Sequence, residues 1–426
     1  MPLLIRLPRN ERVLSETGSY PSGLNILSRK ETAVQRQLRR GGLASYEPAT
    51  QATLLALVQL APRPTTFFDI GAHIGLYSAM MATIFPPALV KVTAFEPTPA
   101  TALIARRVAH FNGLSITVEE TALSSVSGTG RLYISAKAET SNSLKEGFRV
   151  ATTVVDVPMT TLDDYCLKHD VSPGVIKIDV ETFESHVLRG GLATFQAHRP
   201  WLVCELLASG DPESTTAVLL EFESIGYTLH RFEAGGSWVP TSSRTYRDHL
   251  SPEHRDWLLA PSELPDDFAA VLQKWLTAIA ACDKETNILV PAGQRPPDGW
   301  DRPFCSEAPA GNRPDQDHTA IISPRDGATI VPRRLTTASE RKTRRQRMRR
   351  IAVARRALDR GGMPELVRAV RKSLAARVYP GRPPQPARRG PTSKKVPEAS
   401  TAAIAAPSAL AAPSAETGHS RPLTSR

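Results

Sequence analysis

The residues best suited to chemistry in this chain are acids at the ends of short apolar runs. Asp69 ends one such run and leads into a turn that contains Gly71 and Gly75, and Glu96 ends the next run along the chain. Glycine has no Cβ, so it can adopt a positive φ and lets the backbone approach a bound molecule closely. A strand, a glycine turn and a helix in this order can bind a nucleotide-like ligand.

The spacing of this turn indicates which ligand it binds. It reads G-x-x-x-G, whereas dinucleotide sites have G-x-G-x-x-G. The Asp69 carboxylate would repel a pyrophosphate, but it suits ribose hydroxyls or a cation. S-adenosylmethionine carries an ammonium and a sulfonium and no phosphate, so we predict it as the cofactor. Glu96 lies 21 residues after Gly75, a placement that suits two ribose hydroxyls. The alternatives are a purely structural turn and a solvated strand-end acid.

A second group of charges, Lys177, Asp179 and Glu181, alternates with apolar residues. Alternation along a strand puts all three on one face, and ligands bind beyond the carboxyl ends of parallel strands. Glu205 lies at the same edge of the next strand. Asp179 or Glu205 is the candidate base for a hydroxyl proton, with Lys177 beside them. The alternative is an ion pair of Lys177 that only holds the strand end.

Metal and disulfide sites are not predicted. The acidic cluster suits hard divalent cations, but no ligand spacing in the sequence demands one. None of the four cysteines lies in a C-x-x-C pair. The sequence contains no apolar run long enough to span a bilayer and no leader pattern at its start, so we expect a cytoplasmic protein.

The elements that must position these residues follow an alternating pattern from residue 65 onward, which is typical of an α/β fold. We expect a mostly parallel seven-stranded sheet, with strands at 66–70, 90–96, 115–120, 174–180, 201–207, 227–232 and 256–260. Helices are expected at 49–60, 75–85, 103–111, 182–189, 211–225 and 268–279. Residues 131–135 and 152–157 are expected to form a β excursion outside this pattern.

The charge of the chain is unevenly distributed. Its 426 residues carry a net charge of +11, but residues 331–426 have 23 Lys and Arg against 5 Asp and Glu, a net +18. Residues 1–330 have 30 basic against 37 acidic residues, a net −7. The C-terminal tail is also rich in Pro, Ala and Ser, so we predict that it is largely disordered and able to contact an anionic partner.

Several stretches, in sequence order, resemble the FkbM-family methyltransferases. They are FDIGAHIGLYS, AFEPTP, ETALSS, TTLDD, KIDVETFESHVLRGG and CELL. The resemblance covers residues 46–275 and implies a Rossmann-like class I methyltransferase fold that uses S-adenosylmethionine. It also implies O-methylation of a hydroxyl on a saccharide or secondary metabolite. Two positions depart from the family pattern, because His73 replaces an Asn and Thr182 replaces a Gly.

The resemblance also assigns roles to residues: Ala122 and Leu123 line the adenine, and Asp179 lies beside the methyl group. The full cofactor-binding set that we predict is Asp69, Gly71, Ala72, His73, Gly75, Glu96, Pro97, Ala122 and Leu123. The predicted catalytic residues are Lys177, Asp179 and Glu205. The predicted domains are an N-terminal extension (1–45), the methyltransferase domain (46–275), a poorly defined linker (276–330) and the basic tail (331–426).

Two other functions compete with methyl transfer. A nucleic-acid-binding or anionic-surface-binding protein would act through the basic tail. An NAD-linked oxidoreductase is disfavoured, because the G-x-G-x-x-G motif is missing and an acid precedes the glycines. The sequence does not identify the acceptor molecule or the oligomeric state.

Overall fold

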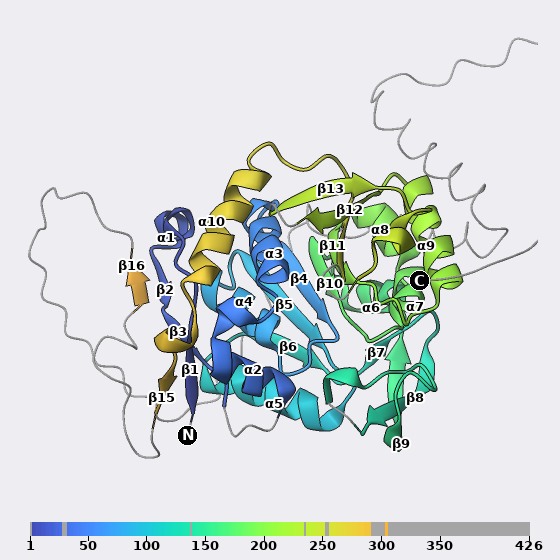
Figure 1. Cartoon of the computed structure of the whole chain (residues 1–426), viewed down its shortest axis with the longest axis horizontal. Coiled ribbons are helices and arrows are strands. Elements are labelled where there is room, and N and C mark those ends of the chain that lie inside the picture. Colours follow the sequence, from blue (N-terminus) through green and yellow to red (C-terminus); the bar gives the residue numbers. More distant parts are fainter. Residues whose placement is uncertain are drawn as a thin grey trace, which may run out of the picture. The chain divides into compact units, whose positions relative to one another are not determined.

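An eight-stranded sheet is the centre of the fold in the computed structural model of the chain, which describes residues 2–27, 32–136, 139–233, 236–251, 255–290 and 303–305 (Figure 1). The strand order is β13-β12-β14-β11-β10-β4-β5-β6. Only β13 and β14 run against the other six strands. The strands are β4 (Thr65–Ile70), β5 (Val90–Phe95), β6 (Ile116–Glu119), β10 (Val175–Ile178), β11 (Trp201–Glu205), β12 (Thr228–Glu233), β13 (Ser237–Thr241) and β14 (Asp256–Ala260).

The predicted α/β sheet is mostly parallel as expected, but the prediction of seven strands is wrong. The additional strand is β13, which forms a hairpin with β12 at the sheet edge. Its Pro240 pairs with His230, and proline inside a run argues against a central strand. At an edge the missing N–H of proline costs nothing, so the strand forms although its sequence pattern is weak.

Helices cover both faces of the sheet (Figure 1). Side chains alternate between the two faces along each strand, so Phe67 belongs to one hydrophobic core and Phe68 to the other. The first core includes α3 (Pro48–Leu60), α4 (Leu76–Ile84), α5 (Pro99–Phe111) and α10 (Phe268–Ala280). The second includes α6 (Leu162–His169), α7 (Glu184–Arg189), α8 (Leu192–His198) and α9 (Pro212–Ser224).

The first 45 residues also contribute to the first core. Leu3, Ile5 and Leu38 are fully or almost fully buried in the same cluster as α3 and α4. The elements here are β1 (Leu3–Arg6), α1 (Glu11–Thr17), β2 (Ser19–Pro21), β3 (Gly23–Asn25) and α2 (Ala33–Gly41). β1 pairs with β15 (Ile288–Leu289), and β2 pairs with β16 (Pro303–Cys305). Segments on both sides of residues 46–275 therefore pack with the central domain.

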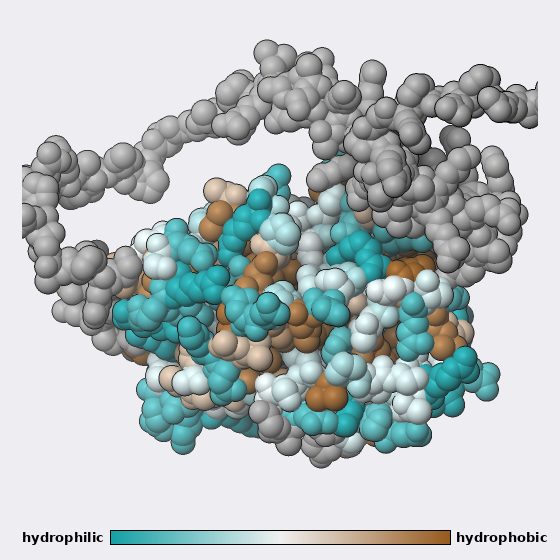
Figure 2. Space-filling view, turned by 90° about the horizontal axis from the view of Figure 1, so that it is seen from above, coloured by the Kyte–Doolittle hydropathy of each residue, from teal (hydrophilic) through white to brown (hydrophobic). Residues whose placement is uncertain are grey.

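The predicted β excursion is confirmed as a separate three-stranded sheet. It consists of β7 (Ala122–Leu123), β8 (Gly128–Ser135) and β9 (Ala151–Thr160). On the face shown in Figure 2, hydrophobic residues lie in separate areas among hydrophilic ones. Among the described residues, no helix is both long and apolar enough to cross a membrane. The predicted disordered tail and most of the predicted linker lie outside the described residues.

Candidate active site

The register of the sheet brings the candidate residues together. Ile70 pairs with Phe95 on one side and with Ile178 on the other, and Ile178 pairs with Cys204. The next residues along these four strands are Gly71, Glu96, Asp179 and Glu205. Glu205 also faces Asp256, the first residue of β14. Because β14 is antiparallel, its beginning lies at this edge, which places Arg255 beside Glu205.

A cavity of about 270 Å³ opens at this edge of the sheet. Its walls come from strand ends, from the first residues of α2, from residues 46 and 47, and from the loop at 140–144. Of the predicted site residues, the cavity is lined by Gly71, His73, Glu96, Pro97, Ala122, Leu123, Asp179 and Glu205. Glu181, which belongs to the second group of charges, lines the cavity too. Lining residues that no prediction included are Tyr46, Glu47 and Arg255.

One half of the cavity has the chemistry expected for S-adenosylmethionine. The Glu96 carboxylate accepts backbone N–H hydrogen bonds from His73 and Thr98, each at 2.8 Å, which fixes both of its oxygens beside the glycine turn. Burial raises the pKa of Glu96. A carboxylate held in this way can still accept hydrogen bonds from ribose hydroxyls. The apolar walls at Ala122 and Leu123 suit an adenine ring, so these residues fit the cofactor.

The glycine turn brings two strand ends into contact. Gly71 has φ +80°, and a Cβ at this position would lie 1.8 Å from the backbone oxygen of Asp179. Only glycine therefore allows the end of β4 to pack against the end of β10. Gly75 has φ +74° at the start of α4, where a Cβ would lie 3.2 Å from the Cβ of Ala105. Gly75 lies behind the cavity wall.

Asp69 and Ala72 also lie behind the wall, because both are buried and neither lines the cavity. The Asp69 carboxylate accepts hydrogen bonds from the backbone N–H and the hydroxyl of Ser78, at 3.1 and 2.7 Å. This contact ties the first turn of α4 to the end of β4. Asp69 thus shapes the site from below the surface that a ligand could touch.

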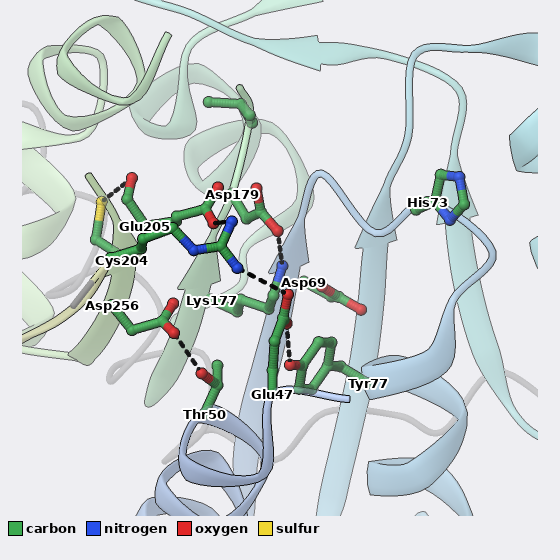
Figure 3. A network of polar contacts seen from close by, with 12 residues as sticks. Glu47, Thr50, Asp69, His73, Tyr77, Lys177, Asp179, Cys204, Glu205 and Asp256 are labelled. Atoms are coloured by element: carbon green, nitrogen blue, oxygen red, sulfur yellow. Dashed lines mark hydrogen bonds and ion pairs between the residues drawn. The ribbon is translucent and has the colours of Figure 1, made fainter. Parts of the chain in front are cut away.

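Charges concentrate in the other half of the cavity (Figure 3). The Lys177 ammonium lies 3.0 Å from Asp179 Oδ2, and its side chain is only 5% exposed. Burial alone would lower the pKa of Lys177, but Asp179, Asp69 and Glu47 outweigh it and raise the pKa. Lys177 therefore stays charged behind the cavity wall and holds Asp179 in place.

Asp179 and Glu205 differ in charge although they lie side by side. Burial works against an ionised Asp179, but Lys177 and a hydrogen bond from Glu205 outweigh it, so the pKa of Asp179 is below its ordinary value. Burial raises the pKa of Glu205 well above its ordinary value, and the charge of Asp179 raises it further. A proton shared between the two carboxyl groups therefore favours Glu205, and Asp179 is the more readily ionised of the two. Arg255 lies 3.0 Å from the opposite side of Glu205.

Glu181 joins this group through a bend in the chain. The strand ends at Ile178, so the predicted alternation does not extend to Glu181, whose φ is +55°. Glu184 fixes the bend by accepting backbone N–H hydrogen bonds from Val180 and Thr182. Carboxylate oxygens of Asp179, Glu181 and Glu205 lie within 4.8 Å of one another. Burial raises the pKa of Glu181 to about 8.

Two residues of the site, Glu47 and Arg255, were missed by sequence reasoning. Glu47 precedes Pro48 at the start of α3, and the only signal was the Tyr-Glu-Pro sequence before an apolar helix. Arg255 precedes the last strand of the sheet, and only knowledge that this strand is antiparallel would have placed it at the site. Both residues lie far in sequence from the motifs.

The comparison with protein families supports the geometry. Residues 69–229 match the family described as the methyltransferase FkbM domain. This chain carries a methyltransferase FkbM domain. The matched segment contains the glycine turn, Glu96, Asp179 and Glu205, whereas Glu47 and Arg255 lie outside it. A search of curated proteins finds no match to the chain.

The FkbM domain is also similar to solved structures. A methyltransferase FkbM from Methylobacillus flagellatus KT is 16% identical with a TM-score of 0.29, over 51% of this chain and 56% of that chain. A precorrin-6y C5,15-methyltransferase from Geobacter metallireducens GS-15 is 12% identical with a TM-score of 0.29, over 55% of this chain and 96% of that chain. A SAM-dependent methyltransferase from Agrobacterium tumefaciens is 10% identical with a TM-score of 0.29, over 51% and 63%. The match thus spans little more than half the length of the Methylobacillus protein.

Proposed function

We propose that this protein transfers a methyl group from S-adenosylmethionine to a hydroxyl of a saccharide or secondary metabolite. The observation that carries the proposal is the arrangement of the cavity inside the FkbM domain. A carboxylate held beside the glycine turn and apolar walls form one half, and a carboxylate with a lowered pKa lies in the other. S-adenosylmethionine, when bound, supplies an electrophilic methyl group on a sulfonium. The protein contributes the alignment of the acceptor and a group that takes its proton.

In this proposal Glu96 holds the ribose, and Ala122 and Leu123 face the adenine. Pro97 and the backbone at Gly71 and His73 complete this half of the cavity. Each of these residues is accessible from the cavity, so a ligand can reach it. Asp69, Ala72 and Gly75 support the wall.

Asp179 is the proton acceptor of the proposed reaction. It is ionised at neutral pH because Lys177 and Glu205 both stabilise its negative charge. The pKa of Glu205 is raised, so Glu205 holds a proton more readily than Asp179 does, and its role is to orient Asp179. Of the two bases that the sequence leaves open, the lowered pKa of Asp179 and the raised pKa of Glu205 favour Asp179. Lys177 acts as a positioning residue, since it does not line the cavity.

The test is isothermal titration of the full chain with S-adenosylmethionine, followed by a mass-spectrometric screen for a 14-dalton gain across hydroxyl-bearing compounds. We expect binding by the wild type and at least tenfold weaker binding by Glu96→Ala, since the variant loses the charged hydrogen-bond acceptor. Lys91→Ala, an exposed residue of β5, is the control and should bind as the wild type does. No binding by the wild type at millimolar cofactor would overturn the proposal.

The competing proposal of nucleic-acid or anionic-surface binding rests on the basic tail, which lies outside the described residues. Removal of residues 331–426 separates the two functions. A methyltransferase retains its activity after this deletion, whereas a tail-driven binder loses its affinity.

A further inference from the structure

Glu47 lies in the charged half of the cavity but belongs to a different part of the chain from the other acids. It is the N-cap residue of α3 and precedes the FkbM-matched segment. Figure 3 shows it rising from the start of the helix toward Lys177, on the same side as Asp179. Its side chain remains 23% exposed, and it lines the cavity. A bound acceptor can therefore touch Glu47.

The backbone at Glu47 is strained in a way that directs its carboxylate into the cavity. Its φ of +44° and ψ of +54° are left-handed, although the following Pro48 favours an extended conformation. An N-cap side chain normally accepts a hydrogen bond from its own helix, but Glu47 makes none. Strained residues of this kind concentrate at functional sites, and His73 and Glu181, which also line the cavity, share a positive φ.

Two neighbours fix the position of the Glu47 carboxylate. The Tyr77 hydroxyl donates a 2.6 Å hydrogen bond to Oε2, and Arg255 lies 3.8 Å from Oε1. Arg255 also pairs with Glu205 at 3.0 Å, so it links Glu47 to the group around Asp179. Glu47 is thereby held beside the proposed proton acceptor with lone pairs still available.

We propose that Glu47 determines acceptor specificity by accepting a hydrogen bond from a second hydroxyl of an uncharged polyhydroxylated acceptor. The inference rests on the proposed methyl transfer and adds a residue outside the FkbM-matched segment to it. Glu47, Asp179, Glu181 and Glu205 surround this half of the cavity with carboxyl oxygens, and Arg255 is already engaged by two of them. Such a surface binds hydroxyl donors, and above pH 8, where Glu47 and Glu181 are ionised, it also repels phosphate or carboxylate groups.

The experiment uses the full chain and matched acceptors. The probes are methyl glucoside, methyl galactoside and methyl mannoside. Each is compared with its own 6-phosphate in a methyl-transfer assay at pH 9, where Glu47 and Glu181 are ionised. We expect the wild type to methylate an uncharged glycoside at least tenfold more efficiently, in kcat/KM, than its phosphate. In Glu47→Gln we expect the acceptor KM to rise about tenfold and the preference over the phosphate to fall about tenfold, because the repulsive charge is gone.

A matched variant separates specificity from folding. Leu55→Ala leaves a void in the core beneath α3, the helix that begins after Glu47, but does not alter the cavity lining. It should therefore lower the melting temperature without changing the preference between glycoside and phosphate. Equal preference in the wild type, or an unchanged preference in Glu47→Gln, overturns the inference while methyl transfer stands. If the protein binds the cofactor but methylates none of the glycosides, the inference of a polyhydroxylated acceptor is overturned, and the proposed use of the cofactor stands. Absence of cofactor binding overturns the proposed function and this inference together.

Discussion

Asp179 and Glu205 show how neighbouring carboxyl groups of one site acquire different charges. Lys177 lies against Asp179, whereas Glu205 is buried and hydrogen-bonded to an existing negative charge. Two carboxyl groups so close cannot both ionise at low cost, so the one with the better cation partner keeps its charge. This difference is the reason why we propose Asp179 as the proton acceptor.

The two residues should therefore respond differently to substitution. Asp179→Asn removes the proton acceptor, and we expect kcat to fall about 10²- to 10³-fold with an unchanged dissociation constant for S-adenosylmethionine. Glu205→Gln keeps a hydrogen-bond donor to Asp179, so its kcat should fall less than about tenfold. Steady-state kinetics on a methylated acceptor and isothermal titration measure both quantities. Equal losses in the two variants would contradict the assignment.

Thr182 occupies a position that the FkbM pattern gives to glycine, and the structure explains the glycine. Its φ is +76°, which a β-branched residue rarely adopts, and its buried hydroxyl has no hydrogen-bond partner. We expect Thr182→Gly to increase the free energy of unfolding by about 1 kcal/mol. The variant removes the backbone strain and the unpaired hydroxyl, and this gain exceeds the cost of the greater entropy of the unfolded chain. Urea unfolding measures it, and a loss of stability would show that the strain is small.

At the scale of elements, the glycine turn between β4 and α4 has a structural role as well as a place in the cavity. Gly71 sits where the ends of β4 and β10 touch, and Gly75 starts the helix. The two glycines share a left-handed backbone but differ in the space around them. Their substitutions should therefore have unequal costs.

We expect Gly71→Ala to destabilise the protein by more than about 3 kcal/mol, because the new Cβ would clash with the backbone of Asp179 in addition to the left-handed strain. Gly75→Ala serves as the matched control and should cost about 1–2 kcal/mol, since its nearest neighbour is a methyl group at 3.2 Å. Denaturant unfolding of both variants tests the difference. Equal costs would mean that the strand ends separate without penalty.

At the scale of the whole molecule, segments far apart in sequence share one hydrophobic core. Leu38 in α2 is as completely buried as Leu55 in α3, although residues 1–45 were predicted to be an extension. We expect Leu38→Ala and Leu55→Ala each to reduce the free energy of unfolding by about 2–5 kcal/mol, because both leave a cavity in the same core. If Leu38→Ala costs less than about 0.5 kcal/mol, the N-terminal segment is dispensable for stability.

Several buried acids also give the whole molecule a pH dependence. Burial raises the pKa of Glu47 and Glu184 to about 7 and that of Glu181 to about 8. An acid whose pKa is higher in the folded than in the unfolded protein stabilises the folded state at pH values below its pKa in the unfolded protein. This stabilisation is lost as the pH rises through the pKa of the acid in the folded protein. The pKa of Asp179 is lowered, so its stabilisation of the folded state is lost only below pH 5. The pKa of Lys177 is raised, so its stabilisation is lost only above pH 9.

We therefore expect the melting temperature of the ligand-free protein to fall between pH 5 and pH 9. Glu181→Gln cannot ionise, so its melting temperature should fall less over this range and should exceed that of the wild type at pH 9. Differential scanning calorimetry at several pH values measures both curves. Parallel curves for the two proteins would show that Glu181 does not titrate in this range.

The sequence predicted those parts of the site that depend on local patterns. The alternation of strands and helices located β4, β5, β10 and β11, and the glycine turn located the cofactor half of the cavity. Glu96, Asp179 and Glu205 could be named because parallel strands put their carboxyl ends at one edge. The roles of the predicted site residues remain predictions until the substitutions are measured.

The sequence by itself thus determined the fold class, the order of the elements and the acids that end the strands, because each depends on a few neighbouring residues. Tertiary structure alone decided that Asp69 lies behind the wall, that β13 adds an eighth strand, and that the pKa of Asp179 is lowered while that of Glu205 is raised. It also brought Glu47 and Arg255 to the site. The position of Glu47 depends on a left-handed backbone before a proline, and that of Arg255 depends on the antiparallel direction of β14. These features arise from register, strand direction and burial, which join residues that no local spacing connects.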